Sequence, residues 1–196
     1  MTQKVLILTH KEDPHAEAVS EVLRDRNILH LVVATEDLPF RYTLSFATSC
    51  PIGIEYFMSD EEKGKVISLD STWNIWNRRI SNPKLSKSIP RDLQDIVDGE
   101  TKKTWEGLLE SHKGKVISKP SAINLGSNKL NQIEFVKNYG SGIYVPDTLV
   151  TNSPYLVHCF YENHKGNICF KLQKGASITR GEESYFVYTN KIRSEH

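Results

Sequence analysis

The chain begins with a pattern of apolar residues that is typical of a parallel β-sheet. Residues 4–8 and residues 30–34 are short, largely apolar runs, and each run predicts a buried strand. Between them, residues 16–26 carry apolar side chains on one helical face. Strand, helix and strand within about thirty residues predict a parallel βαβ unit whose helix packs on the sheet.

Five polar residues, 9–13 (Thr-His-Lys-Glu-Asp), follow the first predicted strand. Parallel sheets bind ligands at the carboxyl ends of their strands, so these residues lie where a ligand is expected. His10 and Asp13 nevertheless fit hydrogen bonding within a loop better than catalysis. No Gly-x-Gly-x-x-Gly motif occurs here, which argues against a Rossmann dinucleotide site.

The next part of the chain has the pattern of short β-strands. Residues 42–47, 52–57 and 65–69 are β-rich and separated by turn-forming residues, which predicts an antiparallel meander with a structural role. Residues 72–79 predict a further strand that ends in Arg78 and Arg79. Two arginines at a strand end can hold a carboxylate or a phosphate bidentately, and a surface pair in ordinary ion bridges is the alternative.

A loop and a long helix complete the predicted first domain. Residues 81–89 are polar and rich in turn-forming residues, which predicts a loop. Residues 92–111 have helical periodicity, with Gly99 marking either a kink or a break into two helices. A brief strand over residues 116–118 precedes Pro120, where we expect helix to give way to loop and the first domain to end.

The remaining residues predict helix, strand, helix, strand, loop and strand in that order. Ser127 is a candidate N-cap for a helix whose apolar residues run from Leu130 to Tyr139. Residues 145–150 predict a strand and residues 155–162 a helix. Residues 166–175 predict a short apolar strand with a glycine loop behind it, and alternation within the strand places Ile168, Phe170 and Leu172 on a core side and Lys171 on the other face.

Composition describes an ordinary soluble protein of one domain or two small ones. The 196 residues include 25 Lys and Arg and 24 Asp and Glu, so bulk charge gives no reason to expect nucleic acid as a partner. Three scattered cysteines, Cys50, Cys159 and Cys169, suit a reducing cytoplasm better than a disulfide framework. No apolar run approaches an export signal or a membrane span, so we expect a cytoplasmic protein with no membrane partner.

Two lysines are candidates for binding phosphate groups. Lys171 is an ammonium on a stiff strand, where it could meet a phosphate as a point charge; a solvated lysine on a wet face is the alternative. Lys129 lies in the first turn of its helix, where the helix dipole disfavours a cation by about 0.3–1 kcal/mol but favours a bound anion. An exposed helix lysine of no special role explains Lys129 as well.

Six segments, taken in their order along the chain, resemble the ATP-grasp ligases, and most closely the microviridin-type enzymes that crosslink ribosomally made peptides. They are residues 5–13 (VLILTHKED), 76–79 (WNRR), 127–130 (SNKL), 145–152 (VPDTLVTN), 170–172 (FKL) and 187–190 (VYTN). The resemblance implies an α/β (α+β) fold with two parts. Residues 1–120 are expected to form the pre-ATP-grasp βαβ sheet domain, and residues 121–196 the small central lobe of the ATP-grasp fold.

The resemblance also implies roles for individual residues. Lys129 and Lys171 match lysines that contact ATP phosphates in such enzymes, and Arg78 and Arg79 lie near the ligand-facing edge of the first domain as candidate substrate-binding residues. Residues 173–181 take the place of the flexible lid over the triphosphate, with Lys174, Gly175 and Ser177 as its candidate phosphate-binding residues. The lid departs from the broader superfamily, because Gly175 and Gly181 are its only glycines.

A second departure concerns the end of the sequence. Family members continue for about another domain, which carries their Mg²⁺ ligands. After Lys171 this sequence offers only Glu182, Glu183 and Glu195 as carboxylates, which is too sparse for a two-metal site. We therefore expect either the amino-terminal part of a longer ligase, with the magnesium ligands in a missing carboxyl-terminal lobe, or a short relative that binds without catalysing. No catalytic residue can be named.

The function implied by the resemblance is ATP-dependent joining of a carboxylate to an amine or hydroxyl. In such enzymes a peptide carboxylate attacks the terminal phosphate of ATP, and an amine or hydroxyl then displaces phosphate from the resulting acyl phosphate. The implied cofactors are ATP and Mg²⁺, and the implied partner is a precursor peptide; a homodimer is left open. The alternative is a non-catalytic module that captures a peptide without using nucleotide.

Overall fold

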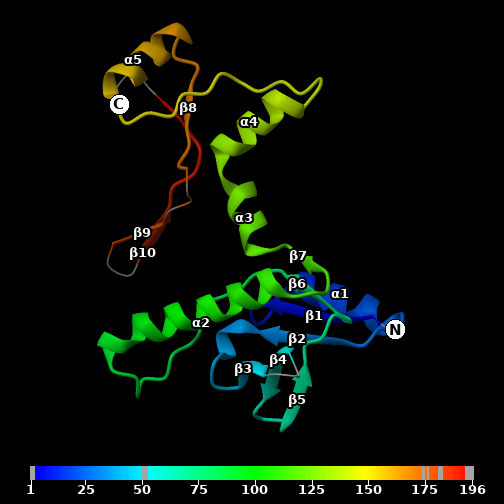
Figure 1. Ribbon diagram of the computed structural model, residues 1–196. Coiled ribbons are helices and arrows are strands. Elements are labelled where there is room, and N and C mark those ends of the chain that lie inside the picture. Colours follow the sequence, from blue (N-terminus) through cyan, green and yellow to red (C-terminus); the bar gives the residue numbers. More distant parts are fainter. Residues whose placement is uncertain (1–2, 50–52, 174, 176, 181–182, 193–196) are drawn as a thin grey trace. The chain divides into compact units, whose positions relative to one another are not determined.

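The chain divides into two units, Met1–Asn124 and Leu125–His196. The computed structural model describes residues 3–49, 53–173, 175, 177–180 and 183–192 (Figure 1). Among the predicted site residues, Lys174 lies outside these ranges. So do Cys50, Gly181, Glu182 and Glu195.

The first unit is built around β1 (Lys4–Thr9), one of the two inner strands of a four-stranded sheet with the order β2-β1-β6-β7. β1 pairs in parallel with β2 (His30–Ala34) on one side and with β6 (Trp73–Asn77) on the other. β7 (Val116–Ile117) extends the sheet in parallel beyond β6. Helix α1 (Pro14–Asp25) connects β1 to β2, so the predicted parallel βαβ unit is confirmed.

The predicted meander is also confirmed. A 3₁₀ turn, η1 (Thr35–Asp37), follows β2 and leads into β3 (Tyr42–Ser49). β3 pairs antiparallel with β4 (Gly53–Asp60), which pairs antiparallel with β5 (Lys65–Ser68). The three strands form a separate sheet in the order β3-β4-β5.

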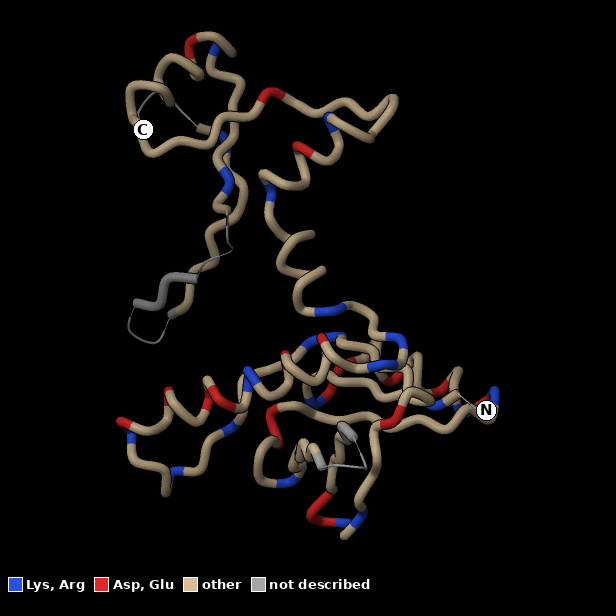
Figure 2. Tube along the Cα trace, viewed as in Figure 1, with Lys and Arg blue, Asp and Glu red and all other residues tan. Residues whose placement is uncertain are grey.

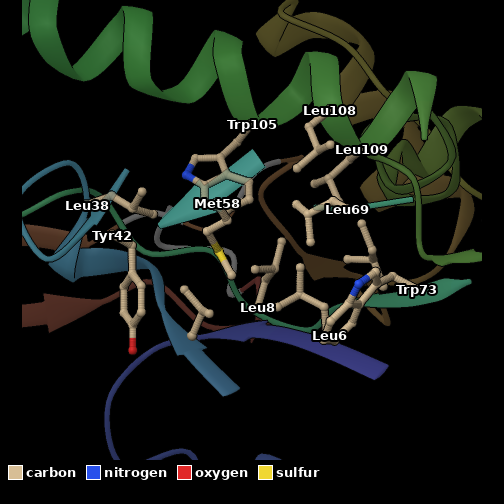
Figure 3. Packing of buried hydrophobic residues seen from close by; sticks show 12 residues of the cluster. Leu6, Leu8, Leu38, Tyr42, Met58, Leu69, Trp73, Trp105, Leu108 and Leu109 are labelled. Atoms are coloured by element: carbon tan, nitrogen blue, oxygen red, sulfur yellow. The ribbon is translucent and has the colours of Figure 1, made fainter. Parts of the chain in front are cut away.

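Helix α2 (Arg91–Ser111) closes the core of the first unit and runs without interruption through Gly99. Residues 81–89 before it contain neither helix nor strand, as predicted. Figure 3 shows the buried side chains of α2 facing β1, with Met58 and Leu69 between them. The core cluster contains Leu6, Leu8, Val33, Leu38, Tyr42, Met58, Leu69, Trp73, Ile75, Trp105, Leu108 and Leu109. Ile7 is equally buried but lies outside this cluster, as strand alternation requires.

Two helices near the division between the units correct the sequence interpretation. Residues 121–126, expected to be loop, lie in α3 (Pro120–Ser127), and α4 (Lys129–Tyr139) follows after a single residue. Because Ser127 is the last residue of α3, it does not cap α4. Asn128 has extended backbone angles and is the N-cap, and its side-chain oxygen accepts hydrogen bonds from the N–H groups of Leu130 and Asn131.

Replacing Asn128 by alanine is expected to destabilise the first turn of α4 by about 1 kcal/mol, because two N–H groups lose their acceptor. Amide hydrogen exchange resolved by residue should show protection falling about fivefold in that turn. Asn131→Ala in the same turn removes a side chain without this capping role and serves as the control. Unchanged exchange at Leu130 would contradict the assignment of the cap.

Residues 145–150, predicted as a strand, have no strand assignment. No described strand pairs with them, and Pro146 has no N–H to donate to a ladder. The helix predicted next is confirmed as α5 (Pro154–Asn163), with Ser153 accepting a hydrogen bond from Leu156 N–H. Lys165 and Gly166, with φ of 53° and 73°, end that helix as expected.

The predicted strand that was to contain Ile168, Phe170 and Leu172 is shorter than expected. Only β8 (Cys169–Phe170) is a strand, paired antiparallel with β11 (Asn190–Lys191), so Lys171 follows the strand instead of lying inside it. Phe170 is 45% exposed, which contradicts its predicted place in a core. A two-residue ladder has no layer to pack against here, since no described residue of the second unit is fully buried.

A hairpin completes the second unit. β9 (Ser177–Arg180) pairs antiparallel with β10 (Glu183–Phe186). Acidic and basic residues are interspersed along the described trace of each unit (Figure 2). Of the helices described, none has both the length and the apolar composition needed to cross a bilayer.

Candidate functional site

At the carboxyl edge of the first sheet, Asp13 follows β1 and caps α1. Its carboxylate is buried, accepting hydrogen bonds from the Thr9 hydroxyl at 2.6 Å and from His15 N–H at 3.0 Å. The Thr9 hydroxyl, then the His15 N–H and the charge of Arg78, hold the pKa of Asp13 below its ordinary value, against an opposing effect of burial. Asp13 is therefore an anion built into the sheet edge.

Arg78 and Arg79 both lie at this edge, but their side chains differ in surroundings. The N–H groups of both donate to the carbonyl of Leu8, at 3.0 and 3.4 Å, which fixes the chain just after β6. The Arg78 guanidinium is turned toward Asp13, with Nε 3.7 Å from Oδ2. The side chain of Arg79 is exposed and contacts no charged partner among the described residues. Substrate binding by the two arginines stays a prediction.

In the second unit, Lys129 reaches the chain segment that carries Lys171. The Lys129 ammonium donates a hydrogen bond to the carbonyl of Gln173, two residues after Lys171. Lys171 itself has an exposed side chain. The start of α4 and the exit from β8 are therefore in direct contact, although they are 44 positions apart in the sequence.

The start of α4 offers a phosphate less than the sequence suggested. Asn128 already occupies the N–H groups of Leu130 and Asn131, and its carbonyl accepts from Gln132 N–H. An anion at this position would therefore be held by the Lys129 side chain more than by free helix N–H groups. An ammonium has three donors, and the bond to Gln173 uses one of them.

The predicted lid is only partly a loop. Residues 177–180 belong to β9, so Ser177 begins a strand of the hairpin. Gly175 is exposed and precedes it. The predicted lid therefore becomes a loop joined to a β-hairpin, because residues 177–180 find antiparallel partners in residues 183–186. Phosphate binding by Lys174, Gly175 and Ser177 stays a prediction.

Two pockets among the described residues bear on the candidate sites. One, of about 490 Å³, lies beside α4 and is lined from α4 by Leu130, Ile133 and Lys137, and by Pro146 and Val150 from the extended segment. Neither Lys129 nor Lys171 lines it. The second, of about 220 Å³, lies in the first unit at the carboxyl edge of the sheet.

The described residues offer no grouped magnesium ligands. Within the described ranges, no three His, Cys, Asp or Glu residues are grouped closely enough to hold a metal ion. His164 Nε2 lies 3.9 Å from Asp147 Oδ2, but these are two residues and not a group of three. The candidate site therefore consists of cationic side chains.

Sequence reasoning missed two parts of these sites. The acceptor for Lys129 is the backbone carbonyl of Gln173, which has no sequence signature, because every residue carries a carbonyl. Glu36 lines the smaller pocket while 93% buried, and it comes from η1, a short turn with no apolar periodicity. The only signal for Glu36 was its place just after a predicted parallel strand.

Comparison with known proteins identifies the family of this chain. Residues 4–124 match the model of the MvdD pre-ATP grasp domain, which is more than half of the chain. The comparison with curated proteins gave no match.

Solved structures share the fold over nearly the whole chain. One is a RiPP-associated ATP-grasp ligase from Chryseobacterium gregarium in complex with ADP and a leader and core peptide, with 24% identity, a TM-score of 0.88, and coverage of 98% of this chain and 57% of that one. The macrocyclase MdnC from Microcystis aeruginosa MRC, bound with the precursor peptide MdnA, has 19% identity, a TM-score of 0.86 and coverage of 98% and 62%. MdnB from the same organism has 24% identity, a TM-score of 0.76 and coverage of 99% and 62%. The chain thus spans about three fifths of the length of these relatives.

Proposed function

The chain belongs to the family of the MvdD pre-ATP grasp domain, and from this membership we propose that it supplies the pre-ATP-grasp and nucleotide-binding parts of an ATP-dependent ligase. The substrate would be a carboxylate of a ribosomally made precursor peptide, to be joined to an amine or hydroxyl. The observation that carries the proposal is the contact from Lys129 to Gln173, which joins the two lysine-bearing segments. The ligands in the relatives' structures, ADP with a leader and core peptide or a precursor peptide, support this choice.

In this proposal, Lys129 and Lys171 hold and orient the phosphates of ATP. ATP supplies the phosphoryl group that converts the peptide carboxylate into a good acyl donor. Fixed ammonium groups stabilise negative charge without having to reorganise, which is the contribution expected from these two side chains. Neither lysine is assigned as a base. Gly175 and the hairpin β9–β10 lie directly after Lys171 and would cover the phosphates.

The proposal predicts that ADP binds the chain and that Lys171 is needed for it. Adding ADP with Mg²⁺ should raise the Tm of the wild-type chain, because a ligand that binds only the folded state stabilises it. Lys171→Ala removes a charge-assisted hydrogen bond and should weaken ADP binding by about tenfold or more. Lys129→Ala should act in the same direction.

The matched control is Lys137→Ala, which removes an exposed lysine from the last turn of α4 and should leave the ADP effect unchanged. Equal losses in Lys137→Ala and Lys171→Ala would show that only bulk charge matters and would contradict the site. A chain that is stabilised by precursor peptide but not by ADP would instead be the non-catalytic peptide-binding module.

A further inference from the structure

The smaller pocket of the first unit collects residues from the loops after three parallel strands. Lys11 follows β1, Glu36 and Asp37 form η1 after β2, and Lys84 lies in the loop after β6. The N–H of Lys84 donates to the Glu36 carbonyl at 2.9 Å, which ties that loop to η1. The pocket therefore opens at the carboxyl edge of the sheet, where α/β sheets bind their ligands.

Most of the charges around this pocket are already paired with one another. Lys11 Nζ lies 2.6 Å from Asp37 Oδ1, and this contact raises the pKa of Lys11. Arg41 Nε lies 3.1 Å from Glu62 Oε2. These two ion pairs cancel four of the six charged groups that line the pocket.

The two remaining groups are Glu36 and Lys84, and they are not paired with each other. Glu36 is only 7% exposed; its Oε1 accepts the Lys11 N–H at 2.8 Å, while Oε2 has no hydrogen-bond donor among the described residues. A buried carboxylate oxygen without a donor is unfavourable, so it marks a place where a donor is expected. The Lys84 ammonium is exposed, and no carboxylate lies within ion-pair distance of it in the described part of the chain.

We propose that this pocket binds an acidic residue of a peptide, whose carboxylate meets Lys84 and whose backbone N–H donates to Glu36. Glu36 lines the pocket, and binding would require its unpaired, buried oxygen to turn toward the ligand. A volume of about 220 Å³ is below the range of whole small-molecule sites and suits one or two residues of a longer ligand. Phe40, which is half exposed, offers the methylene stem an apolar contact.

The choice of a peptide as the ligand rests on the proposed function. The observation that Glu36 and Lys84 are unpaired does not depend on that function. A free anion would pair with Lys84 but would be repelled by Glu36. A free cation would pair with Glu36 but would be repelled by Lys84. A ligand with one carboxylate and one N–H donor satisfies both groups at once. This site is separate in the sequence from the lysines proposed for nucleotide, because all its residues belong to the first unit.

The test uses two blocked peptides, acetyl-Ala-Glu-Ala-amide and acetyl-Ala-Gln-Ala-amide, titrated into the full 196-residue chain without nucleotide. Backbone amide NMR shifts should saturate at Lys11, Glu36 and Lys84, with the glutamate peptide bound about fivefold more tightly. Lys84→Met should remove that preference, while Lys87→Met, in the same loop but outside the pocket, should keep it. Glu36→Gln should weaken both peptides.

Two results would overturn the proposal: equal affinity for the two peptides, or equal losses in Lys84→Met and Lys87→Met. Because nucleotide is absent, this outcome is independent of the ADP experiment. A chain that binds the glutamate peptide here but ignores ADP would retain the pocket and lose the proposed nucleotide site.

Discussion

Replacing Leu8 by alanine should lower the free energy of unfolding of the first unit by about 3–4 kcal/mol. Leu8 is fully buried on the inner strand β1, within the cluster that β1 forms with α2 and the meander (Figure 3). The truncation removes apolar area and leaves a cavity that the paired strands on both sides of β1 cannot close. Because all three tryptophans lie in this unit, urea unfolding followed by tryptophan fluorescence reports on it alone.

Leu29→Ala provides the control for this measurement. Leu29 is 58% exposed and lies just before β2, so the same chemical change should alter the free energy of unfolding by less than about 0.5 kcal/mol. Comparable losses in the two variants would mean that Leu8 does not lie in a packed core, and the assignment of β1 as an inner strand would be wrong.

The core explains why the sequence predicted the first unit well. Leu6, Ile7 and Leu8 are buried on both faces of one strand, and such strands are recognisable as continuous apolar runs. The alternating strands of the meander and the long periodic helix α2 carry similarly strong signals. Each of these elements packs its apolar face or faces against the same core. The local sequence pattern and the tertiary structure therefore agree.

The second unit shows what local pattern cannot predict. Its helices α4 and α5 were predicted because apolar spacing and capping are local signals, although the cap of α4 is Asn128 and not the predicted Ser127. Strand pairing depends on a distant partner, and neither residues 145–150 nor Lys171 lies in a described ladder. Apolar residues such as Leu130, Phe135 and Tyr139 are all more than half exposed, so their spacing predicted a helix but not a buried face.

The candidate sites divide in the same way. The lysines Lys129 and Lys171 could be proposed from sequence, because charge and position were enough to suggest an anion. Whether a charged side chain is paired could not be predicted from sequence, because its partner comes from a loop that is far away in the sequence. Lys11 is neutralised by Asp37, whereas no described carboxylate lies within ion-pair distance of Lys84, and nothing in the sequence around either lysine distinguishes them.

Asp13→Asn should destabilise the first unit by about 2 kcal/mol at pH 7. The asparagine keeps one oxygen for the His15 N–H, but it replaces the charged acceptor of the Thr9 hydroxyl and removes the charge facing Arg78. Asp25→Asn, at the exposed end of the same helix, makes the same change of charge without these partners and should have little effect.

The pH dependence gives this prediction its sign. The pKa of Asp13 in the folded chain is below its ordinary value of 3.8, so the folded state favours the ionised carboxylate. The resulting stabilisation is fully present above pH 3.8 and is lost as the pH falls through the lower folded value. The difference in stability between wild type and Asp13→Asn should therefore be constant from pH 7 to about pH 5 and shrink below about pH 4.

Asp70 and Glu110 also have lowered pKa values, through hydrogen bonds from Thr72 and Ser121, so both wild type and Asp13→Asn lose stability in acid. Only their difference isolates Asp13, and a difference that stayed constant down to pH 2.5 would show that its charge does not matter.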